Sequence, residues 1–217
     1  MRRLFDDELE ELDSDFTEMG LLVADRISAA VTAFTDRDTQ LADRVINHDH
    51  EVNEREIALE QKSFEMIALY QPVTTDLREI VTILKAVSDL ERAADHARNI
   101  AHAALKVTDK ERIPELEALI NQMGTKTTQM IRDVLTAYTS VDEDRAKQIA
   151  QIGQELDELN HDARNLSYEH MKSDPEFKTA ASIYVNVAQD LDRIGDYVTN
   201  VCEWIIYLKS GRIVELD

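Results

Sequence analysis

The stretch Asp89-Leu-Glu-Arg-Ala-Ala-Asp95 decides the fold, because a close copy, Asp190-Leu-Asp-Arg-Ile-Gly-Asp196, occurs 101 positions later. Asn99 follows the first copy and Asn200 follows the second at the same offset. A second set of matches lies upstream at an offset of 104, where Met19-Gly20 corresponds to Met123-Gly124 and Ala33-Phe34-Thr35 corresponds to Ala137-Tyr138-Thr139. Ordered matches at two places indicate one structural unit used twice.

Each copy of this unit contains three segments with helical periodicity, at about 4–34, 38–70 and 75–106, then at 113–138, 142–171 and 175–209. The chain has only 5 glycines and 3 prolines, and helix-forming residues dominate the rest. Gln71-Pro72 ends the second segment, since the residue before proline avoids the α region, and Thr75 is the expected N-cap of the third. Breaks are expected at Val107-Thr108-Asp109-Lys110 and Ser173-Asp174-Pro175. The sequence predicts an all-α fold of two tandem three-helix bundles, residues 1–107 and 108–217, with six long antiparallel helices.

Composition and charge exclude several classes of protein. The net charge of -20 and the pI of about 4.6 disfavour binding to nucleic acid or to anionic membranes, and favour cations or basic proteins. The single cysteine, Cys202, rules out a disulfide within the chain and fits a reducing compartment. The N-terminus has no apolar core of a signal peptide, and no apolar run of about 18 residues occurs. We expect a cytoplasmic protein without membrane insertion.

An acidic residue and an aspartate stand four positions apart in each copy of the repeated motif. The pairs are Glu91 with Asp95 and Asp192 with Asp196. Positions i and i+4 share one face of a helix, so the like charges of each pair repel each other by about 0.2–0.5 kcal/mol. The first pair continues the line of the apolar stripe of its helix, which places it in a groove between helices. Carboxylates without thiols suit hard cations such as magnesium, calcium or manganese, and also iron, so we expect a metal site in each copy.

The preceding helix of each copy supplies further candidate ligands. Asp49 and Asn53 have the same spacing in the first copy, and their counterparts in the second are Gly153 and Asp157. The second copy therefore lacks one of these ligands. Two alternatives stay open at this point, namely solvated acids that pair with lysine or arginine, and a helical scaffold that holds no metal.

Other sets of residues are weaker indications of chemistry. Glu158-x-x-His161 is half of a di-iron carboxylate motif, whereas such four-helix sites need two of these motifs and two further glutamates. His48 and His50 are expected at the surface, and Cys202 is expected to be a buried structural thiol. No phosphate-binding loop or nucleophile elbow occurs. The residues therefore favour a protein that is not an enzyme.

The order of these motifs resembles the PhoU family of phosphate-uptake regulators over nearly the whole chain. The resemblance begins at Arg2-Arg3-Leu4-Phe5-Asp6-Asp7-Glu8-Leu9, is strongest in the two acidic motifs, and includes Met19-Gly20, Gln71-Pro72-Val73, Asp76-Leu77-Arg78, Asn200 and Glu203-Trp204. The chain departs from the family pattern at Gly153, where an acid is common, and at Ala93-Ala94, where Ile-Gly is usual.

The resemblance implies metal at both acidic motifs, with iron, zinc, magnesium or manganese as the ion. The implied ligands are Glu91, Asp95, Asp192 and Asp196, with Asp49, Asn53 and Asp157 as secondary ligands and Glu203 as a further candidate.

The resemblance also implies a regulatory role. Members of the family are negative regulators of phosphate uptake and of the phosphate-starvation response. They act with the ATPase of the phosphate ABC transporter and with a sensor histidine kinase at the inner membrane face. A homodimer is expected on the same grounds. The alternative function is a metal-dependent, carboxylate-bridged enzyme or a metal-storage protein on a helical bundle.

Overall fold

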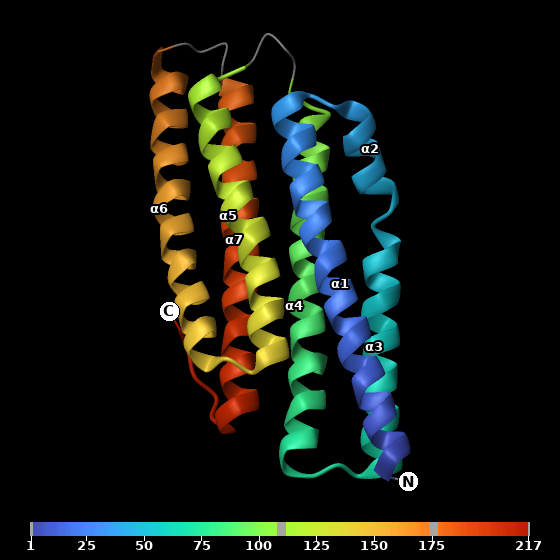
Figure 1. Ribbon diagram of the computed structural model, residues 1–217. Coiled ribbons are helices and arrows are strands. Elements are labelled where there is room, and N and C mark those ends of the chain that lie inside the picture. Colours follow the sequence, from blue (N-terminus) through green and yellow to red (C-terminus); the bar gives the residue numbers. More distant parts are fainter. Residues whose placement is uncertain (1, 108–111, 174–177, 217) are drawn as a thin grey trace.

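The computed structural model describes residues 2–107, 112–173 and 178–216, and every regular element in these ranges is a helix. The helices are α1 (Arg2–Asp36), α2 (Thr39–Asn47), α3 (His50–Tyr70), α4 (Thr74–Ala104), α5 (Pro114–Ser140), α6 (Glu143–Ser173) and α7 (Lys178–Ser210) (Figure 1). The predicted fold class is therefore confirmed. The breaks expected at 107–110 and 173–175 lie largely outside the described residues, and the division at residues 107 and 108 stays a prediction.

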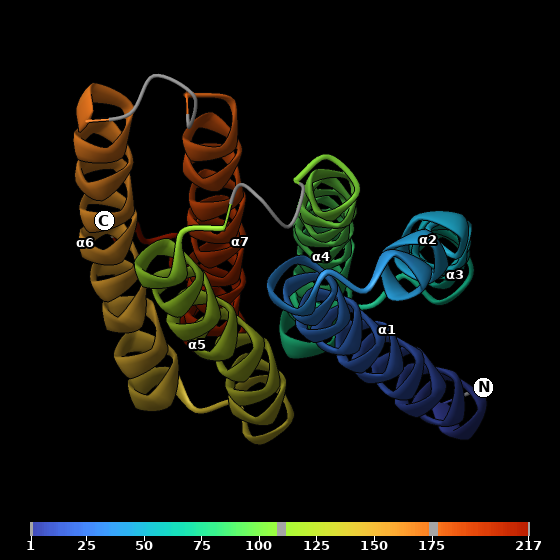
Figure 2. The same cartoon turned by 90° about the horizontal axis from the view of Figure 1, so that it is seen from above.

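The long helices form two layers, which Figure 2 shows from above. One layer contains α3, α4, α7 and α6 side by side in that order, and α1 and α5 pack together against it. The helices α4 and α7 run antiparallel, as do α1 and α5 (Figure 1). The two helices that carry the repeated acidic motif therefore lie next to each other in the middle of the molecule.

The segment from Asp38 to Tyr70 differs from the prediction, because the one expected helix is divided into α2 and α3. The break falls at His48 and Asp49. Arg26 of α1, which is 7% exposed, donates hydrogen bonds to the main-chain carbonyl oxygens of both residues. Its guanidinium thus adds a second donor to each of these carbonyl oxygens, which also accept the main-chain N–H groups of Glu51 and Val52.

Most helix ends lie close to their predicted positions. Gln71, with φ 49°, ends α3 directly before the proline, and Gly211, with φ 72°, follows α7. The prediction of Thr75 as a helix cap was wrong, because α4 begins at Thr74 with the extended residue Val73 as its N-cap. Within the described residues, no helix contains a stretch that is both long and apolar enough to cross a bilayer.

One hydrophobic core extends through both repeats. Phe16 and Phe34 of α1 are fully buried, and their rings contact Tyr138 of α5 and Tyr184 of α7 edge-on, at centroid distances of 4.8 and 5.2 Å. Aromatic pairs of this kind contribute about 0.5–1.5 kcal/mol beyond the area they bury. Because each pair joins α1 to a helix of the second repeat, the repeats pack as one body.

Candidate metal-binding sites on the acidic helices

The four-helix layer carries an acidic cluster in each repeat. The first cluster consists of Asp49, which directly precedes α3, and Glu56 of α3, with Glu91 and Asp95 of α4. The second cluster consists of Asp157 and Asn160 of α6 with Asp192 and Asp196 of α7. Glu91 and Asp95 correspond to Asp192 and Asp196 at the offset of 101, and Glu56 corresponds to Asn160 at the offset of 104, whereas the counterpart of Asp49 is Gly153. The structure therefore brings six of the seven predicted ligands into two equivalent grooves.

The remaining predicted ligand, Asn53, is half-buried on α3 between Asp49 and Glu56. Two cluster members, Glu56 and Asn160, were not predicted. They correspond to each other at the offset of 104, and each follows a predicted ligand, Asn53 or Asp157, by three positions. Helical residues three apart share a face. This spacing could have identified Glu56 and Asn160 from the sequence. Their correspondence is hard to recognise because one is a carboxylate and the other an amide.

Burial and repulsion between carboxylates act together on the acids of the first cluster. Burial, followed by the charges of Asp95, Glu56 and Asp49, raises the pKa of Glu91 to about 7. Burial also raises the pKa of Glu56, against a hydrogen bond with Ser88. A carboxyl group whose pKa is raised by neighbouring acids is stabilised in its charged form by any cation that enters the site. The electrostatics of the first cluster therefore favour a bound cation.

An arginine stands between two carboxylates of the first cluster. Arg98 Nη1 lies 2.9 Å from Asp49 Oδ2 and 3.4 Å from Asp95 Oδ1, and Arg26 Nη1 lies 4.0 Å from Asp49 Oδ1. The Arg98 side chain is 42% exposed, so it can turn toward solvent. A metal ion held by both aspartates would take the place of its guanidinium.

The second cluster contains an amide between carboxylates. Asn160 Nδ2 donates to Asp192 Oδ2 at 2.7 Å, and burial together with the neighbouring Asp157 raises the pKa of Asp192 to about 6. Asn160 is 6% exposed, and its carbonyl atom Oδ1 is buried without a hydrogen-bond partner. A buried acceptor without a partner costs about 1–3 kcal/mol, which a cation at this oxygen would offset.

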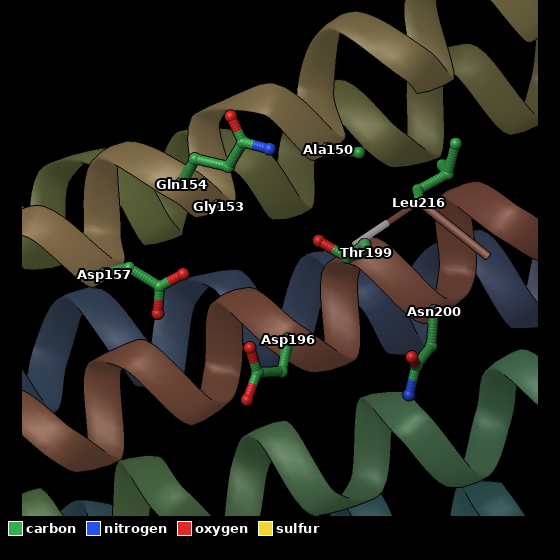
Figure 3. A pocket seen from close by; sticks show the side chains of 8 residues that line it. All are labelled: Ala150, Gly153, Gln154, Asp157, Asp196, Thr199, Asn200 and Leu216. Atoms are coloured by element: carbon green, nitrogen blue, oxygen red, sulfur yellow. The ribbon is translucent and has the colours of Figure 1, made fainter.

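A pocket of about 340 Å³ opens beside the second cluster (Figure 3). Asp157 and Asp196 line it from opposite helices, together with Thr199 and Asn200. Gly153 also lines it and contributes no side chain, where the first repeat has Asp49. The second copy therefore has no side chain at this position of the pocket wall, where a Cβ atom would lie 3.2 Å from Thr199 Oγ1.

The residues of both clusters fit a hard cation by their chemistry. In their present positions, no three His, Cys, Asp or Glu side chains within the described ranges could hold one ion. Nevertheless, each cluster presents carboxylate oxygens on two adjacent helices, and the second adds the unpartnered Asn160 oxygen. Oxygen ligands of this kind suit magnesium, manganese and iron.

The other candidates from the sequence lie apart from the clusters. Glu203 Oε1 accepts a hydrogen bond from the main-chain N–H of Leu216 at 2.8 Å, which ties α7 to the C-terminal segment. Glu158 and His161 are exposed. Cys202 is buried as predicted, and burial raises the pKa of its thiol to about 12, so it is an inert part of the core.

Comparison with known proteins agrees with the duplication. The family model for the PhoU domain matches the chain twice, at residues 16–104 and 120–205. The phosphate-specific transport system accessory protein PhoU homologue of Streptococcus pneumoniae serotype 4 is 34% identical over 217 residues, which is 100% of both chains. The homologue of Clostridium acetobutylicum is also 34% identical, over 100% of this chain and 99% of its own length.

Two solved structures have the same fold. The crystal structure of the phosphate transport system regulatory protein PhoU from Streptococcus pneumoniae matches with a TM-score of 0.90 and 31% identity, over 97% of this chain and 99% of that one. The crystal structure of PhoU from Pseudomonas aeruginosa matches with a TM-score of 0.91 and 31% identity, over 96% and 100%. Because sequence and structure agree over essentially the full length, the chain belongs to the PhoU family.

Proposed function

We propose that this protein is a negative regulator of phosphate uptake and of the phosphate-starvation response. In this role it is a cytoplasmic adaptor between the ATPase of the phosphate ABC transporter and a sensor histidine kinase, and it binds divalent metal or iron at its two acidic clusters. The observation that carries the proposal is the pair of equivalent carboxylate clusters on one four-helix layer. They occur in a chain that matches phosphate transport accessory proteins from end to end.

The ligands proposed for the first cluster are Glu91, Asp95 and Asp49, with Glu56 and Asn53 beside them. Those for the second are Asp192, Asp196 and Asp157, with the oxygen of Asn160. The metal would supply positive charge between the helices of each groove. Bound there, it would join α3 to α4 and α6 to α7, and so stiffen the four-helix layer.

Elemental analysis and calorimetric titration with Mn²⁺ or Fe²⁺ test the metal sites. We expect binding near unit stoichiometry per cluster, a loss at one cluster in Asp95→Ala, and a loss at the other in Asp196→Ala. Glu158→Ala is the matched control, because this exposed acid of α6 lies outside the second cluster. If both aspartate variants bound as much metal as the wild type, the proposed sites would be wrong.

The regulatory role needs a separate test. Deletion of the gene should raise phosphate uptake and the expression of a phosphate-starvation reporter in phosphate-rich medium. The wild-type chain should also capture the transporter ATPase and the histidine kinase from membranes. Normal uptake and normal reporter expression in the deletion strain would contradict the proposal, whatever metal the protein binds.

A carboxylate-bridged enzyme or a metal-storage protein remains the alternative function. An oxidase of this type would need a second Glu-x-x-His motif, and the single one, Glu158 with His161, lies on exposed positions. Oxygen consumption by the iron-loaded protein would support this alternative over the regulatory role.

A further inference from the structure

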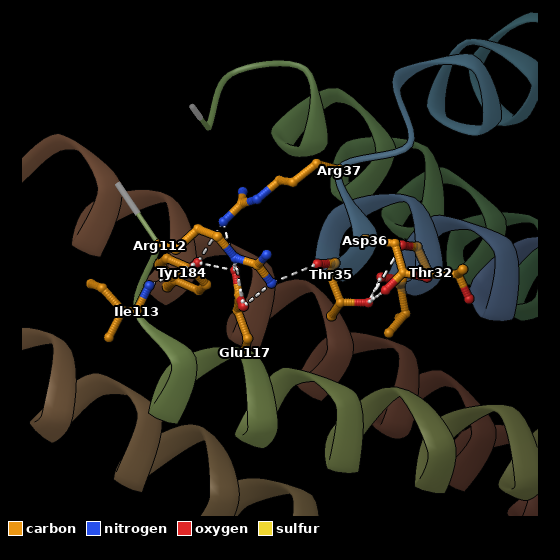
Figure 4. Close-up of polar contacts among 9 residues, drawn as sticks. Thr32, Thr35, Asp36, Arg37, Arg112, Ile113, Glu117 and Tyr184 are labelled. Atoms are coloured by element: carbon orange, nitrogen blue, oxygen red, sulfur yellow. Dashed lines mark hydrogen bonds and ion pairs between the residues drawn. The ribbon is translucent and has the colours of Figure 1, made fainter. Parts of the chain in front are cut away.

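The junction of α1 with α5 has two ends, and each end contains a carboxylate bonded by a tyrosine. At one end, shown in Figure 4, Glu117 Oε1 accepts hydrogen bonds from Tyr184 Oη at 2.9 Å and from Arg37 Nη2 at 2.6 Å. At the other end, Asp13 Oδ1 accepts a hydrogen bond from Tyr138 Oη. Both tyrosines take part in the aromatic contacts to α1 that join the repeats.

The two ends correspond through the internal repeat. Asp13 and Glu117 are 104 positions apart, as are Arg37 and Val141. Arg37 and Val141 each follow the first helix of their repeat in the left-handed conformation, with φ values of 60° and 49°. At the Asp13 end, Val141 thus occupies the backbone position that is equivalent to the position of Arg37 at the Glu117 end. The Asp13 end lacks the equivalent guanidinium.

A second carboxyl group takes the place of the arginine at the Asp13 end. Glu79 of α4 is hydrogen-bonded to Asp13. The pair lines a pocket of about 380 Å³, which has no lysine or arginine in its wall. Among the described residues, the titratable groups around the pair are acidic or phenolic: Glu10 and Glu18 of α1, Asp76 of α4 and Tyr138 of α5, while α7 contributes Leu208.

Two carboxyl groups in contact without a nearby cation cannot both ionise without strong repulsion. A proton on Glu79 converts the repulsion into a hydrogen bond that Glu79 donates to Asp13. Burial, followed by the hydrogen bond and the charge of Asp13, raises the pKa of Glu79 to about 8. The same surroundings, through burial and the charges of Asp13 and Glu79, raise the pKa of Tyr138 well above its usual value.

We propose that Glu79 carries a proton that it shares with Asp13 in a hydrogen bond, and that loss of this proton loosens the end of the junction where α1 and α4 pack against Tyr138. The pair is a pH-sensitive latch within the first repeat at the place where Tyr138 of the second repeat bonds Asp13, and it acts independently of metal and of the proposed function. The Glu117 end, with its arginine partners, has no such dependence at alkaline pH. The direction follows from linkage: a carboxyl group protonated in the folded state but ionised in the unfolded chain makes stability fall as pH rises toward its folded pKa.

The first test measures stability by urea unfolding between pH 5 and pH 9.5 for the wild type and for Glu79→Gln, which keeps a hydrogen bond to Asp13 but no charge. We expect the folding constant of the wild type to fall relative to the variant by up to about tenfold per pH unit, and to level off above pH 8. Glu10→Gln is the matched control, because it removes an exposed charge from the same pocket. A constant ratio across this range, or an equal effect of Glu10→Gln, would overturn the proposal.

The second test restores the missing cation from within the chain. Val141→Arg places a guanidinium at the position equivalent to Arg37, and Val141→Gln is the uncharged control. The gain in stability of the arginine variant over the glutamine variant should be larger at pH 9 than at pH 6, since the pair is doubly charged only at high pH. Hydrogen exchange at the C-terminal end of α5 should slow in parallel. If the gain were the same at both pH values, the shared proton would be ruled out, even if Glu79→Gln failed to fold.

Discussion

Gly20 of α1 lies so close to Leu135 of α5 that a Cβ atom on the glycine would be 2.5 Å from Leu135 Cδ2. The repeat partner of this contact exists too. A Cβ on Gly124 of α5 would be 2.6 Å from Cγ2 of Val31 on α1, and both members are shifted by 104 positions. The two glycines therefore allow the close crossing of α1 and α5 from both sides.

Replacing either glycine tests this crossing. Alanine favours a helix by about 1 kcal/mol over glycine, but overpacking costs about 1–3 kcal/mol. Leu135 can move its terminal methyl groups by a change of rotamer, whereas the branched side chain of Val31 is stiff. We expect Gly124→Ala to lower the free energy of unfolding by about 1–2 kcal/mol, and Gly20→Ala to lower it less. Urea unfolding measures both, and a stabilising Gly124→Ala would contradict the close contact.

The repeat offsets in the sequence predicted the packing of the helices, whereas helical periodicity predicted only where most helices begin and end. The shift of 104 relates Gly20 to Gly124 and also their contact partners, because duplication preserves how one helix packs on another. The break at His48 and Asp49 was not predictable from periodicity. Arg26, whose guanidinium bonds the two carbonyl oxygens at the break, lies more than 20 positions away on α1.

The sequence predicted the part of each acidic cluster that lies on one helix, but not the contacts between helices. Spacing along one helix identified the pairs on α4 and α7, since residues four apart share a face. The pairing of Asp49 with Arg98 depends instead on how α3 packs on α4, and the sequence does not show that packing. The bond between Asp13 and Glu79 likewise joins α1 to α4, and neither residue belongs to a recognisable motif.

A buried polar pair joins α4 to α7 and offers a second test of the junction. Asn200 Nδ2 donates to Asp89 Oδ1 at 3.1 Å, and Asp89 is 7% exposed. Burial raises the pKa of Asp89, and the hydrogen bond from Asn200 opposes that rise. Asn200→Ala should therefore destabilise the protein by about 1–3 kcal/mol in thermal or urea unfolding. Its repeat counterpart Asn99 is exposed, so Asn99→Ala should change stability by less than about 0.5 kcal/mol. Equal effects of the two variants would refute this role of Asn200.

The second acidic cluster should gain affinity when its missing carboxylate is restored. Gly153→Asp places an acid at the position equivalent to Asp49, facing the pocket with Asp157 and Asp196. We expect its dissociation constant for Mn²⁺ to fall at least about tenfold, the scale on which even indirect partners alter metal affinity. Without metal, the added charge should cost about 0.2–0.5 kcal/mol through repulsion of Asp157 one turn away. The control is Gln151→Asp, which adds the same charge at an exposed position outside the pocket. Equal Mn²⁺ affinities in the two variants would contradict the assignment of the second cluster.

The Glu117 end of the α1–α5 junction should respond to acid, in the direction opposite to the Asp13 end. Burial tends to raise the pKa of Glu117, but hydrogen bonds from Arg112 and Tyr184 and the charge of Arg37 outweigh it, so the pKa lies below the usual 4.5. A carboxylate with a lowered folded pKa stabilises the protein above its unfolded pKa, and this stabilisation is lost as pH falls through the folded value. Glu117→Gln should therefore be destabilising at pH 7, and its difference from the wild type should shrink below about pH 4.5. Arg112→Gln should lower the free energy of unfolding at pH 7 by less than Arg37→Gln does. The reason is that the Arg112 side chain is 49% exposed, whereas the Arg37 side chain is 10% exposed. Urea unfolding measured from pH 3 to pH 7 distinguishes these outcomes. If the difference in stability between Glu117→Gln and the wild type did not change with pH, the carboxylate charge would not be what stabilises this end of the junction.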